Sequence, residues 1–266
     1  MPPLLNIAVR AARRAGDTIL RYLGRLESLE VATKSRNEFV TEVDRLAEQE
    51  IVQTIRRNYP DHGVLAEESG RHGNRNSEFL WVIDPLDGTT NFIHGVPIFS
   101  VSVALQHRGR LEHGVIYDPM RQELFTASRG EGAQLDGRRI RVSRTHALEQ
   151  ALIGTGFPYR SKALWVDRYL EMLQVIMDRS AGVRRPGSAA LDLAYVAAGR
   201  FDGFWEFGLQ PWDMAAGVLL IREAGGMAGG LTGEDDFEAN GNIVAGNPKI
   251  FAALLETIRP FLPAHS

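Results

Sequence analysis

Apolar residues follow a helical period in two parts of the N-terminal region. They recur at three- and four-residue intervals over Leu4–Leu20, with arginines between them, and again over Glu42–Tyr59. This period places apolar side chains on one face, so the sequence predicts two amphipathic helices packed on a core. Thr41 is a residue type that favours the position before a first helical turn, and it is the expected N-cap of the second helix. The polar stretch Lys34–Asp44 separates the two periodic segments.

The next part of the chain has the pattern of β-strands. A short apolar run, Val64–Ala66, and a longer one, Phe79–Ile83, are separated by the polar stretch Arg71–Glu78, which we expect to be a loop. Four further runs rich in β-favouring residues follow, with turn signals such as His107-Arg108-Gly109 and Asp136-Gly137 between them. These runs are Phe99–Leu105, Arg110–Tyr117, Glu123–Ala127 and Ala133–Leu135. Short turns between consecutive strands predict an antiparallel sheet.

Strands and helices alternate in the rest of the chain. The predicted elements are a strand at Ala151–Thr155, a helix at Ala163–Arg179, a helix that opens at Gly187–Ala190 and ends near Gly199, a strand at Asp202–Glu206, a helix at Asp213–Ala224, a strand at Ile243–Ala245 and a helix at Lys249–Ile258. No internal repeat or low-complexity linker interrupts this order. We therefore expect one layered α/β domain over residues 1–266, built from two packed lobes of approximately 1–145 and 146–266.

Composition narrows the range of functions. The chain has 266 residues, of which 44% are hydrophobic and 24% charged, and this suffices for a large core. A net charge of −3 gives no electrostatic footprint for general nucleic-acid binding. The absence of cysteine excludes disulfides and thiolate chemistry, and fits a cytoplasmic protein. No apolar stretch is long enough to span a membrane, and the first residues lack the long apolar core of a signal peptide.

The segment WVIDPLDGTT, residues 81–90, carries the strongest chemical signal. An apolar strand leads into it and is expected to stop at Pro85, which lacks a backbone donor. Asp84 and Asp87 then project from one tight turn, and Gly88 permits close approach of the backbone. Clustered carboxylates repel one another unless a cation lies between them, and Mg²⁺ prefers such oxygen ligands. The hydroxyls and N–H groups of Thr89 and Thr90 would suit a phosphate bound beside the metal.

Two alternatives apply to this segment. Asp-Pro-x-Asp-Gly is also ordinary turn chemistry, and the pattern alone leaves that reading open. The second alternative is the Asp-x-Asp-Gly-Thr signature of haloacid-dehalogenase-type phosphatases, in which the first Asp is a nucleophile. Those carboxylates are two residues apart, whereas Asp84 and Asp87 are three apart with Pro85 between them. The spacing therefore argues against an aspartyl-phosphate enzyme.

Two further acidic positions lie at the ends of predicted elements, where catalytic groups are commonly placed. Glu67 and Glu68 follow the short run that begins at Val64, and Asp213 precedes an apolar helix. Taken singly, Asp213 reads as a helix N-cap, and the two glutamates read as solvated loop residues. Together with Asp84 and Asp87 they form a candidate metal site.

These motifs resemble those of the inositol monophosphatase family. Residues 81–92 resemble its first signature, and residues 212–226, which begin Trp-Asp-Met-Ala-Ala-Gly, resemble its second. Glu67-Glu68-Ser69 and Val40–Asp44 are similar to two shorter upstream motifs, in the family's order. The resemblance covers nearly the whole chain, and residues 187–200 are similar to the bacterial SuhB branch. It implies an α/β fold of the αβαβα sandwich type, with an N-terminal antiparallel sheet and a C-terminal α/β lobe.

The resemblance also implies Mg²⁺-dependent hydrolysis of a phosphate monoester. Carried over by motif position, one Mg²⁺ is held by Glu67, Asp84 and the Leu86 carbonyl, and a second by Asp84, Asp87 and Asp213. A third, weaker ion would use Glu67 and water, and Li⁺ is expected to inhibit by competing with Mg²⁺. Two metals can clamp the attacking water and the leaving oxygen of an in-line displacement. Glu67, Asp87 and Thr89 are the implied catalytic residues, and Thr89 is expected to hydrogen-bond toward Glu67 and orient the water.

The same resemblance implies the substrate contacts. The phosphate would bind at Gly88, Thr89 and Thr90, and Lys34 and Asp44 would lie behind the metals. Glu206 lies seven residues before Asp213, which matches the family spacing and implies a substrate contact. The alternative is that Glu206 is an ordinary surface residue. Loop shape around Glu206 and Lys162 is expected to decide the substrate. The implied contacts for the hydroxyls of a sugar alcohol are Asp87, Gly187, Ser188, Ala189 and Glu206.

Two functions from different classes follow. The first is an inositol-1-monophosphatase acting on myo-inositol-1-phosphate, with fructose-1,6-bisphosphate or a nucleotide phosphate as alternative substrates. The second, implied by the SuhB branch, is a regulatory partner of RNA polymerase and antitermination proteins. Arg184-Arg185 is then a contact point with a partner or a second subunit, or else a solvated charge pair. A homodimer is expected in either case, with no direct nucleic-acid contact.

Overall fold

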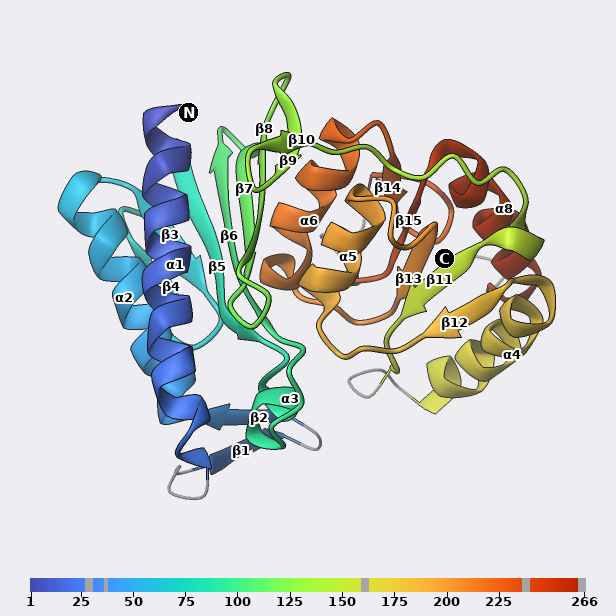
Figure 1. Cartoon of the computed structure of the whole chain (residues 1–266), viewed down its shortest axis with the longest axis horizontal. Helices are drawn as coiled ribbons and strands as arrows, with labels where there is room; N and C mark the ends of the chain where they lie inside the picture. Colours follow the sequence, from blue (N-terminus) through green and yellow to red (C-terminus); the bar gives the residue numbers. More distant parts are fainter. Residues whose placement is uncertain (27–30, 36–37, 159–162, 236–239, 263–266) are drawn as a thin grey trace.

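The structure is a computed structural model that describes residues 1–26, 31–35, 38–158, 163–235 and 240–262. Its principal helices are α1 (Pro3–Leu23), α2 (Glu42–Asn58), α4 (Ala163–Arg179), α5 (Ala189–Ala197), α6 (Pro211–Glu223) and α8 (Pro248–Ile258). They alternate with two sheets in five layers (Figure 1). The pair α1 and α2 covers one sheet, α5 and α6 lie between the sheets, and α4 and α8 cover the second sheet. The predicted αβαβα sandwich is confirmed.

The first sheet has eight strands, and its strand pairs are antiparallel except for β3 with β5. In spatial order the strands are β10 (Arg138–Arg139), β9 (Gly132–Leu135), β8 (Glu123–Ser128), β7 (Arg110–Asp118), β6 (Ser100–His107), β5 (Phe79–Asp87), β3 (Gly63–Ala66) and β4 (Gly70–Gly73). The predicted turns at Arg108-Gly109 and Asp136-Gly137 are confirmed, because both residues of each pair have positive φ. This backbone twist suits tight hairpins between antiparallel strands.

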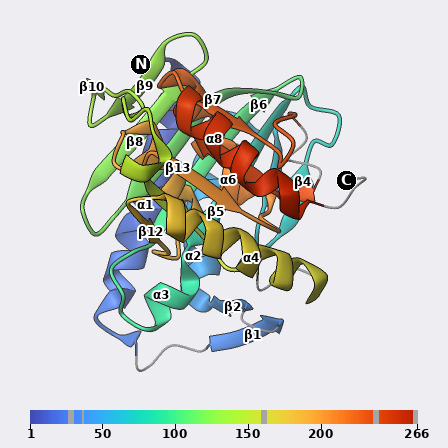
Figure 2. The ribbon, with the colours of Figure 1, turned by 90° about the vertical axis from the view of Figure 1, so that its right-hand side faces the viewer.

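The second sheet mixes parallel and antiparallel strands. Its order is β12 (Gly182–Arg184), β11 (Leu152–Thr155), β13 (Gly203–Glu206), β15 (Ile243–Gly246) and β14 (Met227–Gly229). β11 pairs in parallel with β12 and β13, and β15 pairs antiparallel with β13 and β14. Short 3₁₀ turns at Leu148–Gln150 and Arg259–Phe261 flank this lobe. Figure 2 shows α4 and α8 in front of this sheet, as its outer layer.

The N-terminal helices owe their packing to small residues and to a cap. The inner face of α1 includes Ala11, Ala12 and Ala15, all fully buried, so the helix approaches its neighbours closely. At the start of α2 the Thr41 hydroxyl accepts a hydrogen bond from Val43 N, and the Asp44 carboxylate accepts one from Thr41 N. This capping box satisfies donors that a helix start leaves unpaired. The predicted N-cap is confirmed.

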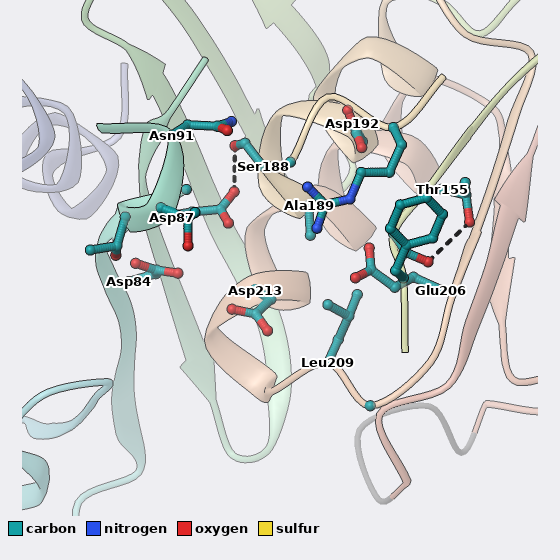
Figure 3. A pocket seen from close by; sticks show the side chains of 18 of the residues that line it. Asp84, Asp87, Asn91, Thr155, Ser188, Ala189, Asp192, Glu206, Leu209 and Asp213 are labelled. Atoms are coloured by element: carbon teal, nitrogen blue, oxygen red, sulfur yellow. Dashed lines mark hydrogen bonds between the residues drawn. The ribbon is translucent and has the colours of Figure 1, made fainter. Parts of the chain in front are cut away.

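The middle layer explains why two helices are apolar on all sides. In α5 and α6 most side chains are buried, because each helix has a sheet on one side and helices or a second sheet on the other. The two helices approach closely at Gly217, where a Cβ would stand 2.5 Å from the Cβ of Leu193. Both helices begin at the same edge of this layer, and their first turns face the end of β5 (Figure 3).

Some local predictions were wrong. Strands β1 (Val31–Ser35) and β2 (Glu38–Thr41) overlap the polar stretch 34–44, where no strand was predicted, and β4 covers the first residues of the expected loop at 71–78. These strands, and the three-residue strands β12 and β14, have no apolar alternation because they are short and lie at sheet edges or in a separate two-stranded sheet.

The expected end of β5 at Pro85 was also wrong. The strand continues to Asp87, with a register shift between Asp84 and Asp87 against β6. A β-bulge absorbs the missing donor, which is why proline is tolerated there. Among the described residues, no helix is both long and apolar enough to cross a membrane.

Candidate active site

The end of β5 presents two carboxylates at its bulge. Asp84 is 2% exposed, and its Oδ1 accepts a hydrogen bond of 2.9 Å from Leu86 N, which closes a tight turn around Pro85. Asp87 follows at the last position of the strand and is also buried. Because the bulge adds residues on one strand only, it turns both carboxylates to the same side. The Asp-Pro-x-Asp-Gly segment therefore forms a tight turn and also brings together two carboxylates that could bind a cation.

Gly88 makes the turn into the next element. Its φ of 100° lies in the left-handed region, and a Cβ would stand 3.0 Å from Ile98 O and 3.2 Å from Phe99. A side chain at this position would be strained by both the backbone and the neighbouring loop. The short helix α3 (Thr89–Ile93) starts directly after it, so Thr89 and Thr90 lie in its first turn.

Asp213 comes from the first turn of α6. Its Oδ2 accepts a hydrogen bond of 2.7 Å from the backbone N–H of Gln210, so it is the third residue of a capping box in which Gln210 is the N-cap. The predicted helix begins two residues earlier than expected, at Pro211. Carboxylate oxygens of Asp84, Asp87 and Asp213 lie within 4.8 Å of one another (Figure 3). Asp213 therefore caps its helix and joins the acidic cluster.

Glu67 lies at the turn after β3, beside the cluster. Its N–H donates to Ile83 O at 3.1 Å, which extends the pairing of β3 with β5 by one residue. The following N–H, of Glu68, donates to Glu48 Oε2 on α2 at 2.9 Å. These two bonds fix the turn, and Glu67 lines the same cavity as Asp84, Leu86 and Asp87. Four acidic residues from three separate elements thus meet at one place.

Burial and charge repulsion raise the pKa values of Asp84 and Asp87. Burial raises the pKa of Asp84 well above its ordinary value, and the charges of Glu67, Asp87 and Asp213 raise it further. Burial raises the pKa of Asp87 to about 6, although hydrogen bonds from Ser188 and Ala190 favour its charged form. Buried carboxylates at this spacing favour a bound cation with oxygen ligands. The residues present therefore fit a hard divalent metal ion such as Mg²⁺.

Thr89 differs from expectation in its hydrogen-bond partner. Its hydroxyl lies 2.9 Å from Asp44 Oδ1 and 3.0 Å from Leu86 O, in place of the expected bond toward Glu67. The other oxygen of Asp44 accepts bonds from the N–H and hydroxyl of Thr41, and burial raises the pKa of Asp44. Asp44 thus lies behind the cluster as predicted. The side chains of Lys34 and Lys162 lie outside the described residues.

The start of α5 forms the opposite wall of the cavity. Ser188 Oγ donates to Asp87 Oδ2 at 2.5 Å, and Ala190 N donates to the same oxygen at 2.8 Å. Asn91 Nδ2 donates to Pro186 O and to Ile98 O, which ties the loop before α5 to α3. Gly187, with φ 99°, lies in this loop. The predicted residues 187–189 are therefore brought to Asp87 by contacts that span about 100 sequence positions.

The cavity has a volume of about 320 Å³ and is lined by every residue that the family resemblance implies as a catalytic residue, a metal ligand or a substrate contact. Glu206, at the end of β13, lies across it from Asp84 (Figure 3). The sequence analysis missed several lining residues. Among them are Asn91, Gly156, Phe157, Arg185 and Asp192. Asp192 is four residues after Ser188, so the helical period from a predicted site residue was the available signal.

Comparison with known proteins agrees with this geometry. The family model described as the inositol monophosphatase family matches residues 1–262. The chain belongs to the inositol monophosphatase family. A protein named Nus factor SuhB from Pseudomonas aeruginosa is 57% identical over 266 residues, which cover 99% of this chain and 98% of the relative. The suspected resemblance is thereby confirmed, including its SuhB branch.

Solved structures of family members share the fold. The extragenic suppressor protein SuhB from Bartonella henselae superimposes with a TM-score of 0.94 and 44% identity, over 97% of this chain and 99% of that one. An inositol monophosphatase from Anabaena superimposes with a TM-score of 0.84 and 41% identity, over 98% of this chain and 97% of that one. The inositol monophosphatase fold is therefore shared along nearly the full length of both relatives.

Proposed function

We propose that this member of the inositol monophosphatase family is a Mg²⁺-dependent phosphatase of phosphate monoesters, with myo-inositol-1-phosphate as its substrate. The observation that supports it best is the set of three carboxylates within 4.8 Å of one another on the wall of a 320 Å³ cavity. Such a cluster is unfavourable without a cation. The cavity is also wide enough for a small phosphate ester.

The proposed ligands divide into overlapping sets. Glu67, Asp84 and the Leu86 carbonyl would hold one Mg²⁺, and Asp84, Asp87 and Asp213 a second, while a third, weaker ion would use Glu67 and water. When bound, the ions would lower the pKa of a water molecule and neutralise the charge of the phosphate. The three carboxylates of the second set come from β5 and α6, so this part of the site needs both the first sheet and the middle layer in place.

Protein groups would then orient the reactants. The Thr89 hydroxyl donates a hydrogen bond to Asp44 Oδ1, so the lone pairs of Oγ1 would be free to accept a hydrogen bond from a water in the cavity and orient it. The N–H groups of Gly88, Thr89 and Thr90 would hold the phosphate oxygens. Asp44, in this proposal, acts through Thr89 as a positioning residue.

The sugar alcohol would lie against the α5 and β13 walls. Hydrogen bonds from Ser188 and Ala190 fix Asp87, and Gly187, Ser188 and Ala189 form the edge of the cavity next to it. Glu206 at the far wall would accept hydrogen bonds from hydroxyl groups of the alcohol.

Gly156 is expected to control the position of Glu206. A Cβ on Gly156 would overlap the Glu206 carboxylate, so Gly156→Ala should displace that side chain. We expect KM for a polyol phosphate to rise several-fold, by about 3- to 10-fold for the loss of one hydrogen bond, with a smaller change in kcat. Steady-state kinetics tests this. Gly24→Ala is the matched control, because nothing lies within 4 Å of a Cβ there; equal KM values for the two variants would contradict the prediction.

The substrate is tested by phosphate release from myo-inositol-1-phosphate, fructose-1,6-bisphosphate and a 2′-nucleotide, with titration of Mg²⁺ and then Li⁺. We expect Mg²⁺-dependent turnover that is fastest on the inositol ester and is suppressed by Li⁺. Faster turnover of another ester would keep the mechanism and change the substrate. If a folded protein released no phosphate from any of the three, the enzymatic proposal would be refuted.

A second function is supported by the relative named Nus factor SuhB, at 57% identity. We propose that this chain also binds the transcription antitermination machinery, through a surface separate from the cavity. Binding to RNA polymerase and Nus proteins in a pull-down with purified components tests this. Binding that persists in a catalytically inactive variant would support an independent docking function, and its absence in the native protein would contradict it.

A further inference from the structure

Asp192 is a buried acid on the wall of the active-site cavity that the proposed mechanism does not use. It lies in the first turn of α5 and is 1% exposed, yet it is among the residues that line the cavity. Figure 3 shows it on the same side of the cavity as Thr155 and Glu206, away from Asp84. Its position therefore faces the alcohol part of a bound ester and not the metal cluster.

One oxygen of Asp192 has no hydrogen-bond partner. Four buried side-chain atoms of the described residues lack a partner, namely Ser180 Oγ, Asp192 Oδ1, Trp205 Nε1 and Trp212 Nε1. Of these residues only Asp192 lines the cavity. A buried acceptor without a donor is costly, and more so for a carboxylate. A ligand that supplies a donor at this point would therefore remove an existing penalty.

The surroundings of Asp192 contain two other acids and one cation. Glu206 and Asp87 act on it with negative charge, and Arg185 acts with positive charge. The Arg185 guanidinium lies over the Phe157 ring, 5.2 Å from its centroid, and so faces the same cavity from the loop before α5. The torsion that rotates an aspartate carboxylate is soft, so either oxygen of Asp192 can turn toward the cavity.

The same surroundings favour a hydroxyl group as the partner of Asp192 over a further metal ion, separate from those proposed at the acidic cluster. Among the described residues, the group close enough to hold a metal consists of Asp84, Asp87 and Asp213, without Asp192 or Glu206. Two acceptors that are spread along one wall instead suit two hydroxyl donors of one polyol. A second phosphate at this wall would meet two carboxyl groups, the buried one of Asp192 and the partly buried one of Glu206, with a single arginine beside them.

We propose that Asp192 is a specificity-determining residue, which accepts a hydrogen bond from a hydroxyl group of the polyol part of the substrate, next to the hydroxyl bound by Glu206. The inference rests on the proposed phosphatase function and specifies its substrate class. Polyol monophosphates with neighbouring free hydroxyls are accepted, and esters without hydroxyls or with a second phosphate at this wall are disfavoured.

The test compares two esters that share a six-membered ring. myo-Inositol-1-phosphate carries hydroxyls around the ring, and cyclohexyl phosphate carries none. For Asp192→Ala we expect kcat/KM on the inositol ester to fall by about 3- to 10-fold, the range for losing one hydrogen bond. On cyclohexyl phosphate we expect a change of less than about 2-fold. Asp192→Asn keeps the size and one acceptor oxygen, so its loss on the inositol ester should be smaller.

Controls separate this inference from a structural effect and from the proposed function. Asp178→Ala, at an exposed position of α4, is the matched surface variant. Equal losses on both esters, or no loss on the inositol ester, would overturn the role of Asp192. If the native protein hydrolysed neither ester, the phosphatase proposal would fail, and calorimetric binding of the two esters to native and Asp192→Ala protein would decide the inference. Equal affinity of the native protein for both esters would then overturn it, and a preference for the inositol ester that the variant loses would support it.

Discussion

Replacing Asp87 with asparagine should abolish phosphate release while leaving the fold intact. The substitution keeps the size of the side chain and an oxygen that can accept the hydrogen bonds of 2.5 Å from Ser188 and 2.8 Å from Ala190. It removes one negative charge from the three clustered carboxylates. We expect kcat/KM to fall at least about 100-fold, since one preorganised electrostatic contact in an active site is worth roughly 10²–10³ in rate.

The measurement is phosphate release from myo-inositol-1-phosphate over a range of Mg²⁺ concentrations. A partial recovery at high Mg²⁺ would locate the defect in metal affinity, and Asp178→Asn on the exposed face of α4 should behave as the native protein. Full activity of Asp87→Asn would show that the proposed metal ligands are wrong. The same variant serves the second proposed function, because a docking surface outside the cavity should not respond to it.

The structure brings together three acidic residues that the sequence singled out, and the reason that they could be singled out is local. Asp84, Asp87 and Asp213 lie close to the end of β5 or the start of α6, two elements with a clear apolar pattern, so the chain alone places these carboxylates to within a few residues of those ends. That they meet depends on the pairing of β5 with its neighbours and on the position of α6 between two sheets. The family resemblance supplied that information.

The opposite wall could not be predicted in the same way. Asp192 and Gly156 matter because they are brought to Glu206 and Asp87 by the packing of α5 and β11. The hydrogen bond from Thr89 to Asp44, 45 positions away, depends likewise on the packing of α2 against β5. In sequence, an aspartate in a helix or a glycine after a strand is unremarkable. Contacts of this range depend on tertiary packing, which period and spacing do not encode.

The end of β5 was predicted wrongly for a related reason. A proline normally ends a strand because it cannot donate to the ladder, and Pro85 led to that expectation. The bulge between Asp84 and Asp87 removes the need for a donor at that position, and the strand continues. A bulge cannot be recognised from apolar alternation, since it is an extra residue that breaks the alternation.

Without metal, the protein should lose stability as the pH rises, and Asp87 should account for a measurable part of the loss. Burial raises the pKa of Asp87 from an ordinary value of 3.8 to about 6. Between these values the folded state holds a proton that the unfolded chain has released. The contribution of this proton to folding is therefore fully present below the ordinary pKa and is lost as the pH rises through the folded-state pKa. At about 1.4 kcal/mol per pKa unit, the loss approaches about 3 kcal/mol for this group.

The comparison with Asp87→Asn isolates this effect, because asparagine does not titrate. In a chelator, we expect the two proteins to have similar free energies of unfolding near pH 4, and the variant to be the more stable one near pH 7. Urea unfolding across this range is the measurement. A native protein that matched the variant at both pH values would show that Asp87 carries no raised pKa.

Mg²⁺ should reverse the order near pH 7. A bound cation favours the ionised form of each carboxylate, so the same charges that destabilise the metal-free protein become ligands that bind only the folded state. The native protein should then gain stability with Mg²⁺ concentration, and Asp87→Asn should gain less. If Mg²⁺ stabilised both proteins equally, Asp87 would not be a ligand, and the raised pKa would reflect burial alone. The crossing of the two stability curves therefore tests the metal site without any reference to catalysis.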